Sequence, residues 1–185
     1  MKLLRCLSML RVWLASAVML LAACAQTPLA VPPAGFAATG KINIRQANQS
    51  DTAQFSWVAA KQQDQLILSS PFGTTLAELV LQYQGDRVSS AVLNRGEQLD
   101  QADDPEQLLQ QLTGLTLPVS GMRWWLRGLP SPNEPFAREG EVLLQNGWRI
   151  TPSDYRNTPL PYRIELLRDD LKVRILINEW NSAAP

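Results

Sequence analysis

Histidine is absent from this 185-residue chain, and only two cysteines, Cys6 and Cys24, occur in it. A chain without histidine lacks the usual general base, the commonest zinc ligand and any Ser-His or Cys-His nucleophile pair. A glycine-rich phosphate loop is missing too, because Gly114, Gly121 and Gly128 stand seven residues apart instead of clustering. The composition therefore disfavours an enzyme, and we expect no metal and no cofactor.

An excess of charge of either sign is also missing, since 17 Lys and Arg balance 17 Asp and Glu. Without a basic stripe to neutralise phosphates, nucleic-acid binding is not expected. The pairs Asp103-Asp104 and Asp169-Asp170 do not suit a glycosidase, because adjacent carboxylates diverge and cannot flank one bond. We interpret the first pair as a helix start and the second as a hairpin turn.

The N-terminus has the form of an export signal. A basic leader precedes residues 12–23, which carry no charge. This apolar stretch is shorter than the roughly 20 residues that span a bilayer, which favours a signal-peptide core over an uncleaved membrane anchor. It ends in Leu21-Ala22-Ala23-Cys24, which looks like a bacterial lipobox. We predict that residues 1–23 are a signal peptide and that Cys24 becomes a lipid-bearing N-terminus.

Lipidation at Cys24 leaves the mature body without a free thiol or a disulfide, so its fold must rest on core packing. Ala25 rather than aspartate follows the cysteine, which under the sorting rule of enteric lipoproteins favours the outer membrane. Residues 24–39 lack periodicity and contain several prolines, and we interpret them as the lipidated N-terminus and a flexible tether. Residues 40–185 then form one domain.

From Gly40 onward, apolar residues alternate with polar ones, which is the pattern of half-buried strands. Short turns such as Gln84-Gly85-Asp86 separate the strands and indicate an antiparallel meander. The residues that share a face within one strand are Ile42 and Ile44; Phe55, Trp57 and Ala59; Leu66 and Leu68; Ala77, Leu79, Leu81 and Tyr83; and Leu171, Val173, Ile175 and Ile177.

Two helices interrupt the strands. Asp103 or Asp104 caps the first, Pro105 occupies its first turn, and an apolar stripe follows up to Gly114. A second helix is predicted over residues 119–127. Asn146-Gly147 then predicts a tight hairpin, and residues 160–180 a longer closing one. The predicted fold is α+β, a curved antiparallel sheet covered by a few helices.

Five tryptophans remain in the mature chain, at positions 57, 124, 125, 148 and 180. A concave sheet lined by such large, stiff, apolar side chains can resist collapse and accept alkyl chains. The same residues can also fill an ordinary core. Periodicity does not distinguish a packed interior from a hollow one.

Several segments resemble the LolB family of outer-membrane lipoproteins. They are Ser70 to Leu79 (SPFGTTLAEL), Leu112 to Pro118, Met122 to Pro130 (MRWWLRGLP), Gly147-Trp148 and Asn178 to Trp180. Their order and spacing cover about Gly40 to Trp180, and the lipobox agrees. In one respect the sequence departs from the family: residues 25–39 replace the helix that usually precedes the first strand.

The resemblance implies an open half-barrel closed by helices, with an apolar interior cavity for acyl chains. A periplasmic carrier, LolA or similar to it, hands over a lipoprotein, and the family member inserts it into the inner leaflet of the outer membrane. No nucleotide is consumed at this step. The protein is expected to be a monomer, lipid-anchored on the periplasmic face.

Phe72 lies where the family carries an exposed apolar side chain on a loop, so the resemblance implies that Phe72 is the membrane-insertion residue. A Phe folded back onto the sheet is the alternative. The resemblance also places Trp125 and Trp148 in the acyl-binding cavity. Alternation alone adds Trp57, Leu79, Leu81, Tyr83, Ile164 and Leu166.

Two other functions fit the same sequence. A structural outer-membrane lipoprotein could scaffold an assembly complex, in which case the core is filled and a strand edge or patch receives the partner. A carrier of a different lipid could use the same scaffold. Bound lipid and transfer from carrier to liposome would separate both from the main prediction.

Overall fold

The computed structural model describes residues 35–132 and 134–182. The predicted signal peptide, Cys24 and most of the tether lie outside these residues. Eleven strands and two helices form in the described part of the chain: β1 (Phe36–Gln46), β2 (Gln49–Ala59), β3 (Gln63–Ser69), β4 (Thr75–Gln84), β5 (Arg87–Arg95), β6 (Gln98–Ala102), α2 (Pro105–Thr113), α3 (Val119–Trp125), β7 (Phe136–Glu139), β8 (Val142–Gln145), β9 (Trp148–Ser153), β10 (Arg163–Arg168) and β11 (Leu171–Ser182).

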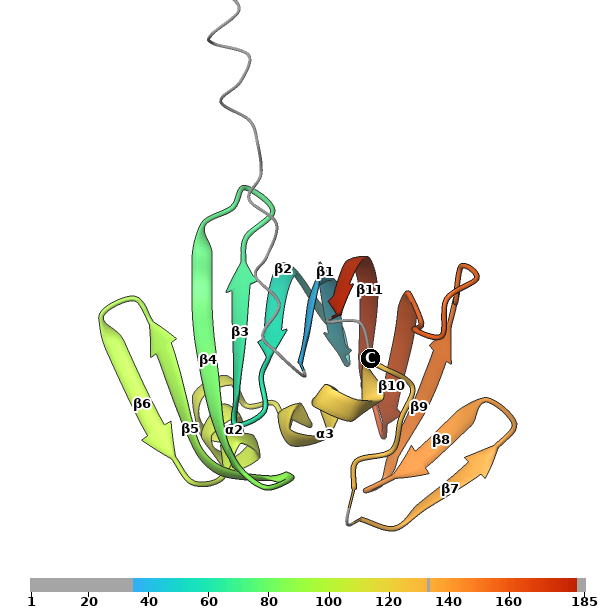
Figure 1. Cartoon of the computed structure of the whole chain (residues 1–185). Helices are drawn as coiled ribbons and strands as arrows, with labels where there is room; N and C mark the ends of the chain where they lie inside the picture. The colour runs from blue at the N-terminus through green and yellow to red at the C-terminus, as the bar shows by residue number, and fades with distance from the viewer. Residues whose placement is uncertain (1–34, 133, 183–185) are drawn as a thin grey trace, which may run out of the picture.

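The described strands form one antiparallel sheet in the order β6-β5-β4-β3-β2-β1-β11-β10-β9-β8-β7. The first and last strands of the chain pair at its centre, from Phe36 opposite Ser182 to Gln46 opposite Leu171. The outermost strands β6 and β7 do not pair with each other, so the sheet is not closed. Figure 1 shows it curving around α2 and α3, which lie inside the curve. The predicted antiparallel meander with covering helices is confirmed.

Alternation along the strands sorts the side chains as predicted. On β2, Phe55, Trp57 and Ala59 are buried, and the residues between them are partly exposed. The four alternate residues of β11 from Leu171 to Ile177 are likewise buried. Because successive side chains point to opposite faces of a strand, this pattern places one apolar face against the helices.

Strand β1 begins at Phe36, within the segment that the sequence assigned to the tether. Residues 36–39 pair with both neighbouring strands, and Phe36 and Ala38 are buried. The register between β1 and β11 shifts at Thr39/Gly40. A Cβ on Gly40 would lie 2.1 Å from the Leu176 carbonyl oxygen, so glycine allows the close approach of the two strands here. Because of this local irregularity, the alternation of apolar and polar residues did not reveal where the strand starts.

The two helices start where the sequence predicted. Asp104 is the N-cap of α2, since its Oδ1 accepts a hydrogen bond from the Gln107 backbone N at 3.0 Å. Gly114 ends α2 with a φ of 76°. Helix α3 ends at Trp125, two residues early, because the amides of Arg127 and Gly128 bond three residues back and tighten the last turn. Of the helices in the described residues, none has the length and apolarity to cross a membrane.

Both predicted hairpins are confirmed, with positive φ at Asn146, Gly147 and Asp169. The sequence did not predict the edge strands β6 and β7. All four residues of β7 are exposed, and those of β6 are exposed or only partly buried. A strand with no buried face has no alternation to detect.

Candidate functional site

An apolar pocket of about 320 Å³ lies between the inner face of the sheet and the helical section. Leucines from the strands and from the helical section dominate its lining, and we call it the leucine pocket. It is lined by Ile42, Ile44, Asp51, Leu66, Leu68, Ala77, Leu79, Leu93, Arg95, Leu109, Thr113, Leu115, Leu117, Val119, Met122 and Val173.

The lining combines the apolar face of the strands with the apolar side of the helical section. Leu66, Leu79 and Leu93 lie opposite one another in adjacent strands, so the pleat points all three side chains the same way. From the other side come Leu109 of α2 and Met122 of α3, together with the non-helical link between them. Leu115 and Leu117 of that link are only partly buried, although they pack against the core. The irregular link between α2 and α3 therefore forms one wall of the pocket without closing it.

Three polar residues interrupt the apolar lining: Asp51, Arg95 and Thr113. Arg95 Nη2 donates to Asp100 Oδ2 of β6 at 3.0 Å, and the two side chains are about one third exposed (32% and 34%). The Thr113 hydroxyl donates to the Leu109 carbonyl at 2.7 Å, which satisfies it within its own helix. Charge is thus confined to two of the lining positions.

Of the eight residues predicted to bind acyl chains, Leu79 lines the leucine pocket. Trp57 borders a gap of about 10 Å³ between Phe55, Leu66 and Met122. Ile164 and Leu166 have no exposed surface and belong to the packed core. Leu81 and Tyr83 are also buried in that core. For all of these residues, Leu79 included, the acyl-binding role stays a prediction.

Trp125 and Trp148 border a different pocket of about 270 Å³, in which polar residues such as Glu106, Asn146 and Arg168 take part. Their ring centroids are 6.5 Å apart, and Trp125 Nε1 donates to Gln145 Oε1 at 2.7 Å. The side chain of buried Gln145 also accepts a hydrogen bond from the Ser131 amide and donates one to the Ser131 carbonyl. Through Gln145, Trp125 therefore fixes the loop that follows α3. This contact is a packing role, and the acyl-binding role of the two tryptophans stays a prediction.

Sequence reasoning omitted most of the residues that line the leucine pocket. Leu66 and Leu68 were recognised as one face of a strand, and Leu109 as part of the stripe of α2. Leu93 lies in β5 one residue beyond Val92 and faces the same way as Ala91. The signal for these residues was present in the alternation. What was missing was which strands face α2.

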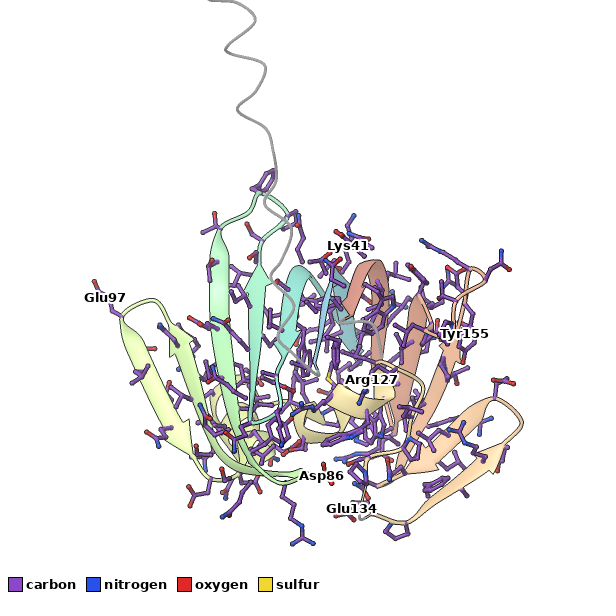
Figure 2. The ribbon with its side chains drawn as sticks, viewed as in Figure 1. Lys41, Asp86, Glu97, Arg127, Glu134 and Tyr155 are labelled. Atoms are coloured by element: carbon purple, nitrogen blue, oxygen red, sulfur yellow. The ribbon has the colours of Figure 1, made fainter. Side chains whose placement is uncertain are left out.

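A second groove, of about 440 Å³, is acidic. Asp86, Asp103, Asp104, Glu106 and Glu134 line it together with Arg87. Figure 2 shows Asp86 and Glu134 close together beneath α3, at the end of the sheet where the β4–β5 turn lies. An alkyl chain is not expected to bind beside carboxylates, because covering them would remove their hydration water at a large cost in free energy. The leucine pocket is therefore the site suited to apolar ligands.

Phe72 lies at the tip of the β3–β4 loop, and the residue is 96% exposed. The Gly73 amide donates to the Ser70 carbonyl at 2.9 Å, and Gly73 has a φ of 88°, so the loop is a tight turn. Gln54 Nε2 of β2 donates to the Pro71 carbonyl at 3.0 Å and fixes the turn from the side. The ring thus projects from a well-defined turn. The alternative of a Phe folded onto the sheet is wrong.

A buried polar cluster lies deeper on the inner face. Asp64 of β3 has no exposed surface; Tyr83 Oη donates to its Oδ2 at 3.2 Å, and Arg123 Nη1 lies 3.4 Å from its Oδ1. Burial raises the pKa of Asp64 to about 6, against the lowering effect of Arg123. Burial also raises the pKa of Tyr83, and the negative charge of Asp64 raises it further. Arg123 also donates to the Ala60 carbonyl, so the cluster ties α3 to β3 and β4.

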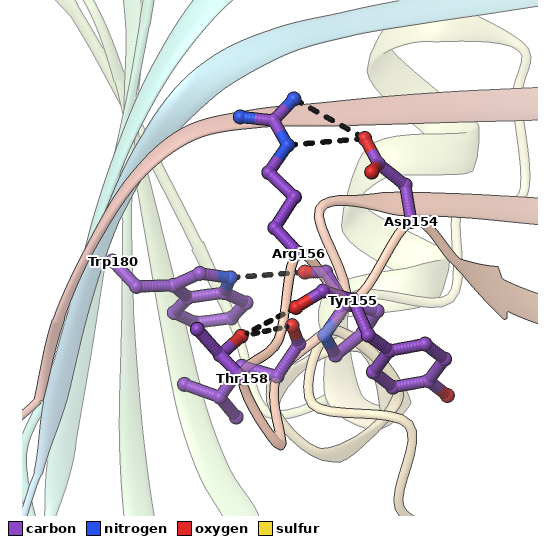
Figure 3. Close-up of polar contacts among 7 residues, drawn as sticks. Asp154, Tyr155, Arg156, Thr158 and Trp180 are labelled. Carbon is purple, nitrogen blue, oxygen red and sulfur yellow. Dashed lines mark hydrogen bonds and ion pairs between the residues drawn. The ribbon is translucent and has the colours of Figure 1, made fainter.

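The loop between β9 and β10 is held by its own polar contacts (Figure 3). Arg156 forms an ion pair with Asp154 at 3.2 Å, and the Thr158 hydroxyl lies 2.8 Å from the Tyr155 carbonyl oxygen. Trp180 Nε1 of β11 donates to the Pro161 carbonyl at 2.9 Å, and the Trp180 ring lies edge-on to Phe36 at 5.6 Å. Trp180 therefore secures the central seam of the sheet.

Comparison with known proteins agrees with this architecture. Residues 34–180 match the family model described as outer membrane lipoprotein LolB. A protein of Chromobacterium violaceum named outer-membrane lipoprotein LolB is 31% identical, over 92% of this chain and 98% of its own length. A protein of the same name from Dechloromonas aromatica is 33% identical, over 92% and 97%. One from Pseudomonas fluorescens is 34% identical, over 79% and 74%.

These matches cover the strands that build the leucine pocket, the Phe72 turn and the helical section. The relatives carry a name that states both the attachment to lipid and the outer-membrane location. The chain accordingly belongs to the LolB family, and it is an outer-membrane lipoprotein that serves lipoprotein localisation.

Proposed function

We propose that this protein receives lipoproteins from a LolA-like periplasmic carrier, holds their acyl chains in the leucine pocket and inserts them into the inner leaflet of the outer membrane. The observation that carries the proposal is the apolar lining of this pocket, which contrasts with the acidic lining of the groove of about 440 Å³. Its volume of about 320 Å³ falls at the lower end of ligand sites, which measure roughly 300–1,000 Å³.

The driving force for such a transfer is the removal of alkyl chain from water. Each buried methylene contributes about 0.8 kcal/mol, and no directional contact is needed. Since the pocket and a bilayer offer similar apolar surroundings, the cargo can move on to the membrane without a nucleotide. Bilayer insertion is favoured because the membrane accommodates every chain of the cargo, whereas the pocket accommodates a part.

The pocket and the exposed Phe72 belong to the same two strands, which supports a direct path between them. Leu68 of β3 pairs with Ala77 of β4, and both line the pocket. The turn that carries Phe72 connects these strands a few residues further on. An aromatic ring at a loop tip can enter the membrane interface, and partly exposed Leu76 adds apolar surface beside it. Inserting this turn would bring the pocket end close to the acyl region.

The N-terminal assignments are part of the proposal. Residues 1–23 act as the signal peptide, and Cys24 carries the lipid that keeps the body at the periplasmic face. Because β1 begins at Phe36, the tether comprises residues 24–35. Such a length, at no more than about 3.3–3.6 Å per residue, allows the body to approach the membrane with the Phe72 turn first. The protein acts as a monomer and needs no cofactor.

A transfer assay tests insertion. Carrier loaded with a labelled lipoprotein is mixed with liposomes that contain the wild-type protein or its Phe72→Glu variant. We expect Phe72→Glu to fold normally and to reduce delivery about tenfold or more, because a charge opposes entry into the interface. Phe136→Glu is the matched control, since Phe136 is also exposed (53%) but lies on edge strand β7. Equal delivery by wild type and Phe72→Glu would refute the role of the turn.

A second variant tests the pocket. Leu68 is partly buried and lines it, so Leu68→Trp should fill space and weaken acyl binding with little loss of stability. Leu167→Trp, on the exposed side of β10, is the control for the added ring. Mass spectrometry of co-purified lipid and binding of a fluorescent acyl probe are the measurements. Unchanged probe binding in Leu68→Trp would remove the basis of the proposal and leave a scaffold role.

A further inference from the structure

One polar side chain of the leucine pocket has a hydrogen-bond donor that no described residue uses. Arg95 lines the pocket at the end of β5, two residues after Leu93 and on the same face. Its Nη2 donates to Asp100, whereas its buried Nε has no acceptor in the described part of the chain. More than about 90% of buried polar groups in proteins are paired. The Nε–H therefore indicates an acceptor that a ligand would bring.

The charges nearby restrict what this acceptor can be. Asp100 already balances the guanidinium charge at 3.0 Å, and Asp51, a second acidic residue, is among the residues that line the pocket. A ligand carboxylate or phosphate would add uncompensated negative charge to an apolar site, which is costly. A neutral carbonyl oxygen accepts the hydrogen bond without that cost. The site thus suits an ester or amide better than a free fatty acid.

The position of Arg95 suits the polar end of a chain. Asn94 pairs with Glu78, so Arg95 lies beside Ala77, at the pocket end that adjoins the Phe72 turn. Leu79 pairs with Leu66 and with Leu93, and these pairs lie two residues further along the strands from that turn. A chain that enters from the turn with its methyl end toward Leu79 leaves its head beside Arg95.

We infer that Arg95 anchors the head of a bound acyl chain by donating its Nε–H to a neutral ester or amide carbonyl. The inference rests on the proposed function, because it assumes that acyl chains occupy the leucine pocket. Acylated lipoproteins and glycerophospholipids both contain such carbonyls. An ether-linked chain of equal length lacks them and provides the matched probe.

The test measures displacement of a fluorescent acyl probe from the full mature chain, with Cys24→Ala to keep the protein's own lipid out of the assay. One arm compares a diacylglyceryl-cysteine peptide with its dialkyl-ether analogue. The other compares lysophosphatidylcholine with its ether analogue. We expect the ester to bind about tenfold more tightly than the ether in at least one arm. The arm with the tighter ester identifies the natural source of the chain.

Variants separate the anchor from the pocket. Arg95→Met combined with Asp100→Asn removes the donor without leaving an unpaired carboxylate, and keeps an apolar stem. This double variant should lose the ester preference and bind the ether as wild type does. Asp100→Asn alone keeps Arg95 and should keep the preference. An ester preference that survives in the double variant would overturn the inference.

The failure of this inference can be told apart from the failure of the proposed function. Equal binding of ester and ether by the wild type contradicts the anchor alone. Binding of neither probe, or binding that Leu68→Trp leaves unchanged, contradicts acyl chains in the pocket and therefore both proposals.

Discussion

The half of the sheet formed by β1–β6 and the half formed by β8–β11 follow the same alternation and differ in what lies beneath them. In the first half, Leu68 of β3 is only partly buried beside the leucine pocket, and so are Leu115 and Leu117 of the link that covers it. In the second, Leu143, Ile150, Ile164 and Leu166 have no exposed surface. We call these the pocket half and the filled half. The comparison shows that an apolar strand face does not by itself determine whether an apolar pocket forms beneath it.

The covering elements explain the difference. Trp125 of α3 lies against Trp148 of β9, and these large rings occupy space on the side of the filled half, where the pocket that they border has a partly polar lining. The pocket half is covered by the short helix α2 and by the irregular link around Leu115. The two bulky rings leave less apolar space beneath the curved sheet than a nine-residue helix and a loop do.

The largest expected effect comes from truncating one leucine in each half. Leu166→Ala should lower the free energy of unfolding by about 2–5 kcal/mol, because it removes packed contacts and leaves a cavity. Leu68→Ala should cost about 1 kcal/mol, since its side chain already borders open space. Denaturant unfolding of both variants measures the difference. Equal losses would mean that the pocket half is as tightly packed as the filled half.

The second largest expected effect is a pH dependence of the free energy of unfolding, which comes from Asp64 in the pocket half. Asp64 has a pKa of about 6 in the folded protein and 3.8 as its ordinary value, so between these values the folded state holds a proton that the unfolded state releases. Stability from this group is therefore present below about pH 4 and is lost as the pH rises to about 6, by about 3 kcal/mol at most.

Asp64→Asn should flatten the fall in unfolding free energy between pH 4 and pH 6 relative to wild type. Thermal melts across this range measure the slope. Asp86→Asn, in the exposed β4–β5 turn, serves as the control and should keep the wild-type slope. A slope that Asp64→Asn leaves unaltered would show that the buried carboxyl does not govern the pH response.

The smallest expected effect is a loss of stability in α2, the helix that covers the pocket half. Asp104→Ala removes the bond to the Gln107 amide and should destabilise α2 by about 1 kcal/mol. Hydrogen exchange should then speed up in α2 and leave β9 and β10 unaffected. Asp103→Ala is a close control, because Asp104 and not Asp103 is the cap residue. Faster exchange in both variants would argue that charge, and not capping, stabilises the helix.

The sequence predicted the fold better than the site. Strand alternation, Pro105 and Gly114 around α2, and the Asn146-Gly147 turn each act over a few residues, so they could be recognised locally. Phe72 was predicted from the family resemblance, and its exposure agrees. Most of the pocket lining was not named, because the resemblance and strand alternation chose the acyl-binding residues, and neither shows which strands face α2. In the structure, Trp57 and Trp125 fill space, and medium-sized leucines line it.

By itself the sequence determined the alternating strands with a buried face, the starts of both helices and the family to which the chain belongs, because these depend on local backbone preferences and on short motifs. Only the tertiary structure decided which strands face α2, where the interior stays open, and that Arg95 and Asp100 meet at its rim. Those features depend on sheet curvature and on contacts between distant residues, which no short stretch of sequence specifies.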